Sequence, residues 1–399
     1  MPRPTIRLYF EDAYLVEFEA RVVAVREVEG RPAVVLDRTG FYPESGGQLW
    51  DLGTIGGAEV LKVLEDGEEV VHVLAKPLEG GTVLGKIDWP RRFDHMQQHT
   101  GQHILSQALL EVLGGETKSF HLGAEESTLE IGLAHISEES QDRVERRASE
   151  IVFENREVKT YEVARERIGE VPLRRPPKVA GAVRVVEVEG FDHSACGGTH
   201  VRRTGEIGLV KILAAERIRG NLRFAFVCGG RALAAFQVRN RAVRDLVGRF
   251  NVKPEEVAGS VERLAAELKD LKKALRRTEE RLAVREAADY LAKAQGRVIA
   301  AVLQEKSPEA ARALALSIVR QGTFAVCFGA FSEARSHLVL ARAESLAADL
   351  RTLVPVLAPL VNGKGGGGPS LVEIAGSREA DLSAAVARAA DLLGNLSWS

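Results

Sequence analysis

The chain has 399 residues, of which 45% are hydrophobic and 28% are charged, an ordinary globular mixture that excludes a disordered or collagen-like protein. No apolar run reaches the roughly 18 residues that a membrane helix needs, so no membrane partner is expected. Three cysteines are too few for a disulfide framework, and a cytoplasmic location is therefore predicted.

The charge is unevenly distributed, although the formal net charge of the whole chain is only −2. Residues 1–230 carry 29 Lys and Arg against 37 Asp and Glu, whereas residues 231–399 carry 25 against 19. The basic C-terminal part fits a nucleic-acid partner, because phosphate contacts supply much of the affinity in such complexes. For any single basic residue, a solvated helix face is an equally good interpretation.

Residues 1–90 consist of short β-rich runs separated by glycines, and residues 91–230 mix helices with strands. The strands expected in the first part are 20–29, 33–36, 59–64, 69–74 and 82–87. The helices expected in the second part are 91–113, closed by Gly114-Gly115, and a helix from an N-cap Ser137 to about Glu154. The strands expected there are 183–188, 208–213 and 223–228.

A long helix and then a small α/β pattern are predicted for the C-terminal part. Eight positions from Val257 to Leu282 follow alternating steps of four and three, a heptad seam that includes one polar residue, Thr278. The seam predicts a coiled-coil segment that pairs either within the chain or in a homodimer. The strands expected after it are 298–303, 323–328, 337–341 and 371–376, and the helices are 307–321, 345–358 and 379–393.

Three histidines, His95, His99 and His103, are spaced by four residues within the helix expected at 91–113. Residues four apart lie on one helical face, so two imidazoles there can bind one metal ion. For one such pair taken alone, a polar helix face without a metal is about as good an interpretation.

A second cluster is Cys196-Gly-Gly-Thr-His200. A thiolate and an imidazole four apart across two glycines suit a tight loop that directs both side chains to one point. Alone, the cluster could be a buried cysteine and a surface histidine. Together, His99, His103, Cys196 and His200 form a set of three histidines and one cysteine that suits Zn²⁺.

A third segment, LDRTGFYPESGGQ, covers residues 36–48. Its Gly46-Gly47 pair permits a close approach of the backbone to a ligand, and Thr39 and Gln48 offer polar groups. Taken alone, this segment is better explained as a tight β turn.

The segments FYPESGGQ, HTGQH and CGGTH, in that order, resemble the editing domain of alanyl-tRNA synthetases and of their free-standing relatives, the AlaX-type alanyl-tRNA editing proteins. The rest of the chain resembles the C-terminal part of alanyl-tRNA synthetase, including a Gly-rich loop similar to residues 362–369 (NGKGGGGP). The resemblance implies an α+β protein of four parts. They are a β-barrel-like domain (1–90), a zinc-containing editing domain (91–230), a helical coiled-coil segment (231–295) and a small α/β DHHA-type domain (296–399).

The resemblance also implies a role for each matching residue. The zinc ligands fall on His99, His103, Cys196 and His200, and His95 is an extra histidine that is not expected to be a ligand. The catalytic residues fall on Thr39, expected to sense a serine hydroxyl, and on Gln48. The substrate-binding residues fall on Gly46, Gly47, Asp192 and Lys364, and other pocket positions align loosely around residues 118–121.

The implied reaction is zinc-dependent hydrolysis of the ester that joins serine to the 3′ end of tRNA(Ala), with Gly-tRNA(Ala) as a second candidate substrate. A synthetase pocket for alanine rejects serine poorly, because one added hydroxyl discriminates weakly. A second site that hydrogen-bonds this hydroxyl recovers the selectivity. Four protein ligands fill a tetrahedral site, so two roles for zinc stay open, activating water or positioning the substrate.

Editing-type sequence begins near residue 1, and no Gly-x4-Gly-Lys-Ser/Thr phosphate loop occurs. No ATP site and no aminoacylation are therefore expected, and editing would act in trans. Two other functions fit parts of the sequence. A non-catalytic tRNA-binding or dimerisation protein would have a closed structural zinc site without an adjoining pocket. A DHH-type phosphoesterase would need clustered aspartates upstream, and Asp94-His95-Met96 is only a superficial likeness.

Overall fold

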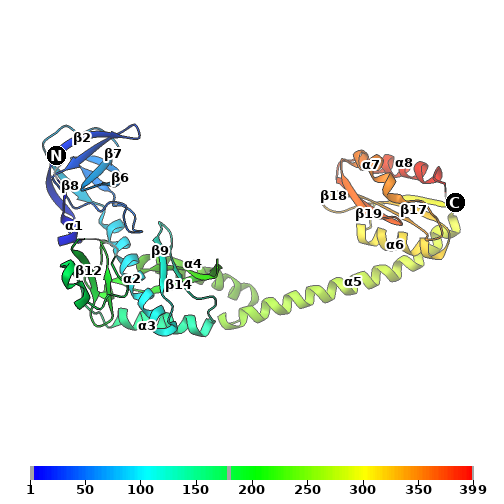
Figure 1. Cartoon of the computed structure of the whole chain (residues 1–399). Coiled ribbons are helices and arrows are strands. Elements are labelled where there is room, and N and C mark those ends of the chain that lie inside the picture. The colour runs from blue at the N-terminus through cyan, green and yellow to red at the C-terminus, as the bar shows by residue number, and fades with distance from the viewer. Residues whose placement is uncertain (1–3, 178–180, 398–399) are drawn as a thin grey trace. The chain divides into compact units, whose positions relative to one another are not determined.

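The structure is a computed structural model that describes residues 4–177 and 181–397. The chain divides into two compact units, residues 1–245 and 246–399, and each unit combines helices with sheets (Figure 1). The mixed α+β class expected from the sequence is confirmed. Among the described residues, no helix is long and apolar enough to cross a membrane.

Six antiparallel strands near the N-terminus close into a barrel around an apolar core that includes Phe18, Leu36 and Phe41. In the order of their pairing they are β2 (Glu17–Val28), β3 (Arg31–Leu36), β7 (Glu69–Leu74), β6 (Ala58–Asp66), β5 (Gly53–Ile55) and β8 (Thr82–Ile87). Glu29 and Gly30 join β2 to β3 with φ angles of 52° and 75°, as a two-residue hairpin requires. A short parallel pair, β1 (Ile6–Arg7) with β4 (Arg38–Thr39), and helix α1 (Leu8–Glu11) accompany the barrel.

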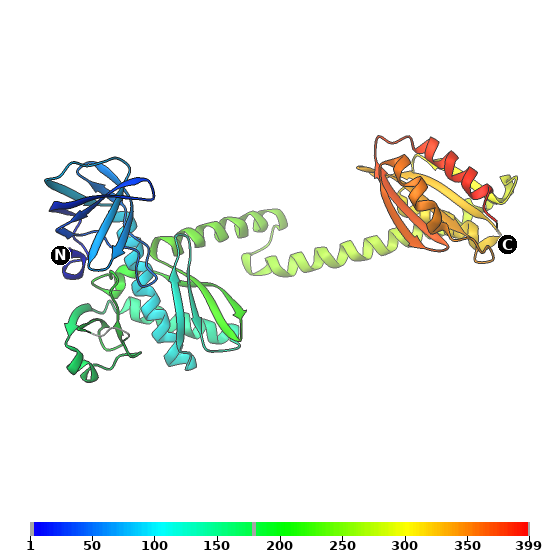
Figure 2. The ribbon, with the colours of Figure 1, turned by 45° about the horizontal axis from the view of Figure 1, so that its top comes forward.

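Helix α2 (Trp89–Leu113) lies at the centre of the first unit (Figures 1 and 2). The Asp88 side chain accepts a hydrogen bond from the backbone N–H of Arg91, and Gly114 ends the helix with φ of 67°, so both ends are capped. The helix expected at 91–113 is therefore confirmed. The buried Arg92 ties α2 to the barrel, because its Nε is 3.0 Å from Oδ1 of the buried Asp51.

Two sheets lie on different sides of α2 (Figure 2). The four-stranded sheet has the order β14 (Val210–Ile218), β15 (Asn221–Cys228), β10 (Ser127–Ile131) and β9 (Thr117–Leu122). The three-stranded sheet has the order β11 (Val158–Val163), β12 (Val183–Val188) and β13 (Asp192–Ala195). Helix α3 (Glu138–Phe153) packs on α2 and begins at Ser137 as expected. Two 3₁₀ turns, η1 (Arg165–Glu170) and η2 (Thr204–Ile207), complete this part.

The second unit contains a five-stranded sheet in which only β16 and β17 are parallel. Its order is β16 (Val298–Leu303), β17 (Ala325–Phe331), β18 (Arg335–Arg342), β20 (Leu371–Ser377) and β19 (Lys364–Gly368). Helices α6 (Pro308–Gln321) and α8 (Leu382–Gly394) both pack against β17, whose residues are nearly all buried. Smaller elements are η4 (Leu350–Leu353), α7 (Val354–Leu357) and η5 (Pro359–Val361).

Two helices precede this sheet, α4 (Gly229–Phe250) and, after η3 (Pro254–Glu256), α5 (Val257–Lys293). With 37 residues, α5 is about 55 Å long. Its first turn is packed through Val257 and Ser260, and its last third through Ala283 and Ala287. The predicted heptad positions from Val261 to Leu282 are exposed, and Leu271 is 67% exposed. The long helix is therefore confirmed, whereas its pairing with another helix stays a prediction.

Two expectations for the C-terminal part are wrong. The helix expected at 345–358 is reduced to η4 and α7, because the Asp349 side chain caps a turn that begins only at Leu350. The Gly-rich segment is not a loop but the edge strand β19. A Cβ on Gly367 would lie 2.2 Å from the carbonyl oxygen of Leu371, so β19 approaches β20 more closely than a side chain would permit.

Candidate metal centre and adjoining cavity

Four side chains converge at one point of the first unit, two from α2 and two from the loop after β13. They are His99, His103, Cys196 and His200, and their ligand atoms all lie within 4.8 Å of one another. Cys196 Sγ is 3.3 Å from Nε2 of His99 and 3.3 Å from Nε2 of His200. Among the described residues this is the only such group of three or more His, Cys, Asp or Glu, and His95 is not part of it.

A partner occupies the Nδ1 atom of each histidine in this cluster. The pairs are His99 with Gln48 Oε1 at 2.8 Å, His103 with Asp192 Oδ2 at 3.2 Å, and His200 with Thr100 Oγ1 at 3.1 Å. This arrangement leaves the Nε2 atoms to converge with the thiol. Partners of this kind fix the ring orientation of metal-binding histidines, and the donor set therefore fits a metal ion on geometric grounds.

A close contact with His99 explains one of the two glycines of the Cys196 loop, Gly198, whereas the space beside Gly197 is open. A Cβ on Gly198 would lie only 2.1 Å from Cε1 of His99, so a larger residue would displace the ring. Arg184 holds the same loop by donating to the carbonyls of Cys196 at 2.8 Å and Gly198 at 2.9 Å. The close contact at Gly198 and the two hydrogen bonds from Arg184 therefore fix the position of the loop beside His99.

The electrostatics of the cluster also favour a metal site. Burial opposes ionisation of the Cys196 thiol, but the neighbouring His99 and His200 and the hydrogen bonds from the imidazoles outweigh it and hold its pKa well below the ordinary range. Burial lowers the pKa of His200 to about 3, which keeps this ring neutral. A thiolate and neutral imidazoles are the forms that bind zinc. Burial alone would lower the pKa of His103, but its hydrogen bonds with Asp192 and Cys196 raise the pKa to about 8, so a bound metal would displace a proton from this ring.

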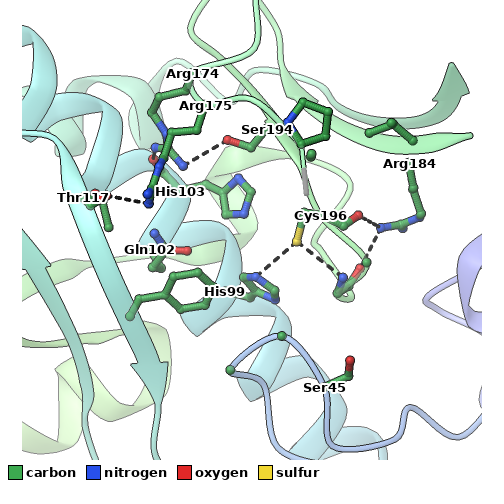
Figure 3. A pocket seen from close by; sticks show the side chains of 18 of the residues that line it. Ser45, His99, Gln102, His103, Thr117, Arg174, Arg175, Arg184, Ser194 and Cys196 are labelled. Carbon is green, nitrogen blue, oxygen red and sulfur yellow. Dashed lines mark hydrogen bonds between the residues drawn. The ribbon is translucent and has the colours of Figure 1, made fainter. Parts of the chain in front are cut away.

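The metal cluster forms one wall of a cavity of about 680 Å³ (Figure 3). Gly46 and Gly47 line it with φ angles of 56° and 87°, which shows why this turn contains two glycines. The described residues that line it include four cations and one carboxylate, namely Lys118, Arg174, Arg175, Arg184 and Glu162. The cavity is therefore basic beside the metal cluster.

The other residues expected at the site are not all brought to the cavity. Gln48 and Asp192 are buried behind His99 and His103 and are not among the described residues that line it. Thr39 is buried in the barrel, where its hydroxyl is 2.8 Å from Nε2 of His72 and accepts from the backbone N–H of Phe41. These contacts fit a turn residue better than a hydroxyl sensor.

Lys364 belongs to the second unit and lies in β19. There it lines a separate hollow of about 760 Å³ together with Arg351 and Asn362.

Sequence analysis missed several cavity residues. Gln102 is buried against the cavity, its Nε2 donates to Ser106 Oγ at 2.7 Å, and its Oε1 has no hydrogen-bond partner among the described residues. Arg174 and Arg175 line the cavity from the segment after η1. The signal for them was present as Arg174-Arg175-Pro-Pro, a basic pair beside two rigid residues, but nothing in its spacing pointed to the histidines.

Comparisons with known proteins agree with this geometry. The family model described as "Threonyl and Alanyl tRNA synthetase second additional domain" matches residues 183–224, which include Cys196 and His200. The alanyl-tRNA editing protein AlaX-L of Pyrococcus horikoshii is 30% identical over 384 residues, which is 92% of this chain and 93% of that protein.

The alanine–tRNA ligase of Pyrococcus abyssi is 38% identical over 298 residues, which is 70% of this chain but 32% of the ligase. That of Pyrobaculum neutrophilum is 36% identical over 337 residues, 79% of this chain and 37% of the ligase. The chain thus spans about a third of the length of these ligases. With the near full-length match to AlaX-L, the chain belongs to the family of alanyl-tRNA editing proteins of the AlaX-L type.

Proposed function

We propose that this chain hydrolyses the ester of mischarged Ser-tRNA(Ala) in trans, with Gly-tRNA(Ala) as a second candidate substrate. Family membership supports an alanyl-tRNA editing hydrolase. The observation that carries the proposal is the cluster of three histidines and one cysteine on the wall of a basic cavity. Such a cavity can take the 3′ end of a tRNA, whose phosphates need cationic partners.

Zinc is the proposed metal, held by His99, His103, Cys196 and His200. When bound there, it supplies a Lewis acid that polarises an oxygen or nitrogen atom of the aminoacyl group. Residues of the chain orient the metal ligands and admit the substrate. Gln48, Asp192 and Thr100 orient the three imidazoles, and the open backbone of the Gly46-Gly47 turn lets the substrate approach closely.

The choice of serine over alanine requires a group that reads the serine hydroxyl. Gln102 lines the cavity and its buried Oε1 has no hydrogen-bond partner among the described residues, whereas Thr39 already pairs with His72. The Gln102 amide nitrogen bonds to Ser106 Oγ, which also accepts from Thr117 at 2.8 Å, and the amide oxygen is on the side away from Ser106 (Figure 3). We therefore assign hydroxyl recognition to Gln102, because an alanyl group leaves this buried acceptor without the hydroxyl as a partner.

The C-terminal part is proposed to bind tRNA and to form a homodimer. Its excess of basic residues supports the first role. The exposed apolar heptad positions of α5, such as Leu271 and Leu275, support the second, because such a seam is stabilised when a second helix covers it. Sedimentation of the wild type and a Leu271→Glu, Leu275→Glu variant tests the dimer, which the charges are expected to dissociate.

A second candidate function is that of a non-catalytic tRNA-binding protein with a structural zinc. The complete set of four protein ligands favours it, because structural zinc sites are closed. The adjoining cavity and the unpaired Oε1 of the lining residue Gln102 favour a catalytic role instead.

A deacylation assay separates these functions. Wild type is incubated with Ser-, Gly- and Ala-tRNA(Ala), and the Cys196→Ala, His200→Ala double variant and zinc-depleted wild type serve as comparisons. We expect rapid loss of serine, sparing of alanine, about one Zn²⁺ per chain, and loss of both zinc and activity in the double variant. Full zinc content without deacylation by wild type would support the structural role. Full zinc retention by the double variant would overturn the assignment of the ligands.

The selectivity assignment is tested by Gln102→Met, with Gln107→Met on the same helix as the matched control. We expect Gln102→Met to lose activity on Ser-tRNA(Ala) while any activity on Gly-tRNA(Ala) changes little. The expected absence of aminoacylation remains a prediction, and an ATP-dependent charging assay with alanine checks it.

A further inference from the structure

Two of the four cations in the cavity already use their donors to support the protein. Arg174 donates to the carbonyl of His103 and to Ser194 Oγ, both at 3.0 Å. Arg184 donates through Nη1 to two carbonyls of the Cys196 loop, and its guanidinium lies over the Phe10 ring at 5.1 Å. Neither guanidinium is well suited to bind a phosphate directly.

Arg175 and Lys118 differ from these two in their exposure, because Arg174 and Arg184 are half-buried whereas Arg175 and Lys118 are exposed. Arg175 is exposed, and among the described residues only its Nη1 is bonded, to the carbonyl of Thr117 at 2.6 Å and to that of Lys118 at 3.4 Å. The Lys118 side chain is 52% exposed, and its Nζ is 3.7 Å from the exposed Glu116 carboxylate, a pair that is weak in water. Because Arg175 rests on the backbone of residue 118, both cations stand at one rim of the cavity.

We infer that Lys118 and Arg175 bind the phosphodiester on the 5′ side of the substrate's terminal adenosine. This inference rests on the proposed function, which places the aminoacyl ester beside Cys196 and the terminal nucleotide in the cavity. A guanidinium anchored through one nitrogen presents its remaining N–H groups in a fixed direction, and this geometry matches a phosphate. Lys118 adds a point charge at the same rim.

The opposite side of the cavity is a poorer phosphate site. Figure 3 places Arg175 and Arg184 on different sides of Cys196. Glu162 lines the cavity on the Arg184 side, whereas Glu116, the carboxylate paired with Lys118, is 70% exposed and is not among the described lining residues. The strand and turn that carry Lys118 and Arg175 therefore set the direction in which the tRNA leaves the cavity.

The test uses the full-length zinc protein and three substrates. They are Ser-tRNA(Ala) and two small compounds that differ only at the phosphate, namely 2′(3′)-O-seryl-adenosine without a phosphate and the same compound with a 5′-phosphate. The variants are Arg175→Gln and Lys118→Gln, and the matched control is Arg167→Gln, an exposed arginine in η1 paired with Glu170. For each protein, KM and kcat are measured separately, with zinc content and melting temperature.

We expect each rim variant to raise KM for Ser-tRNA(Ala) and for the 5′-phosphorylated compound by about 10- to 150-fold, the effect of one hydrogen bond to a charged group. The kcat, the zinc content and the activity on seryl-adenosine should stay at the wild-type level, and the control should match wild type throughout. An equal loss on all three substrates, or no loss on any, would reject phosphate binding at this rim. If the wild type hydrolysed none of the three, the proposed function itself would fail.

Discussion

Gln48 should set the metal affinity of the site although it touches no metal. Its Oε1 accepts from Nδ1 of His99 at 2.8 Å and from the backbone N–H of Thr199 at 3.1 Å, and its Nε2 donates to Thr199 Oγ1 at 2.9 Å. Gln48→Met keeps the volume and removes all three bonds. Loss of an outer partner of a metal-binding histidine costs about 10- to 100-fold in metal affinity.

The same substitution should also lower stability. It leaves the buried N–H of Thr199 without a partner, which costs about 1–3 kcal/mol. A melting temperature falls by about 2–4 °C per kcal/mol in a unit of this size. Gln48→Glu separates the two effects, because a carboxylate oxygen still accepts from His99 and from Thr199.

Competition for zinc with a chromophoric chelator measures the affinity, and Gln107→Met is the control for a Gln-to-Met change at a half-buried position. We expect Gln48→Met to bind zinc about 10- to 100-fold more weakly and Gln48→Glu to stay close to wild type. Wild-type zinc affinity in Gln48→Met, even with a lower melting temperature, would refute the reasoning. If Gln48→Met and Gln48→Glu weakened zinc binding equally, the oxygen that accepts from His99 would not be the cause of the higher affinity of wild type.

Three further predictions concern the barrel and α5. Thr39→Val removes the hydrogen bond to His72, so the melting temperature and the activities on Ser-tRNA(Ala) and Gly-tRNA(Ala) should fall together. A loss of activity confined to Ser-tRNA(Ala) would instead identify Thr39 as the sensor of the serine hydroxyl. Burial lowers the pKa of His72 to about 4, so between pH 6.5 and 4 the unfolded chain binds a proton that the folded chain does not. From pH 7 to pH 4, wild type should therefore lose about 3 kcal/mol more unfolding free energy than His72→Gln, and parallel urea-unfolding profiles would contradict this. Replacing Lys269, Lys272 and Lys273 by Gln should weaken tRNA binding and reduce the slope of log affinity against log salt by up to about 0.9 per lost phosphate contact, whereas an unchanged slope would exclude α5 from tRNA binding.

The sequence by itself predicted the four side chains that meet in the metal cluster, because their spacing encodes local geometry. His99 and His103 are four apart on a helix whose end is signalled by Gly114-Gly115. Cys196 and His200 are four apart across glycines that force a tight loop. Their residue types together suited one Zn²⁺ site, and the family resemblance implied the same set of ligands, although Cys196 lies 93 positions after His103. The same resemblance indicated the family to which the chain belongs.

Only the tertiary structure decided what surrounds these ligands. Thr39 and Gln48 lie in the same short motif, yet the barrel buries Thr39 against His72 and turns Gln48 to His99. Whether a polar side chain faces a cavity or a core depends on how separate strands pack, and no local pattern encodes that packing. For the same reason the sequence does not single out Gln102 among the polar residues of α2, whereas the fold places it at the cavity beside Ser106 with its Oε1 unpaired among the described residues. Arg175 is a candidate phosphate ligand because the fold places its guanidinium against the Thr117 and Lys118 carbonyls of β9 at the cavity rim. Such long-range contacts cannot be inferred from the local sequence.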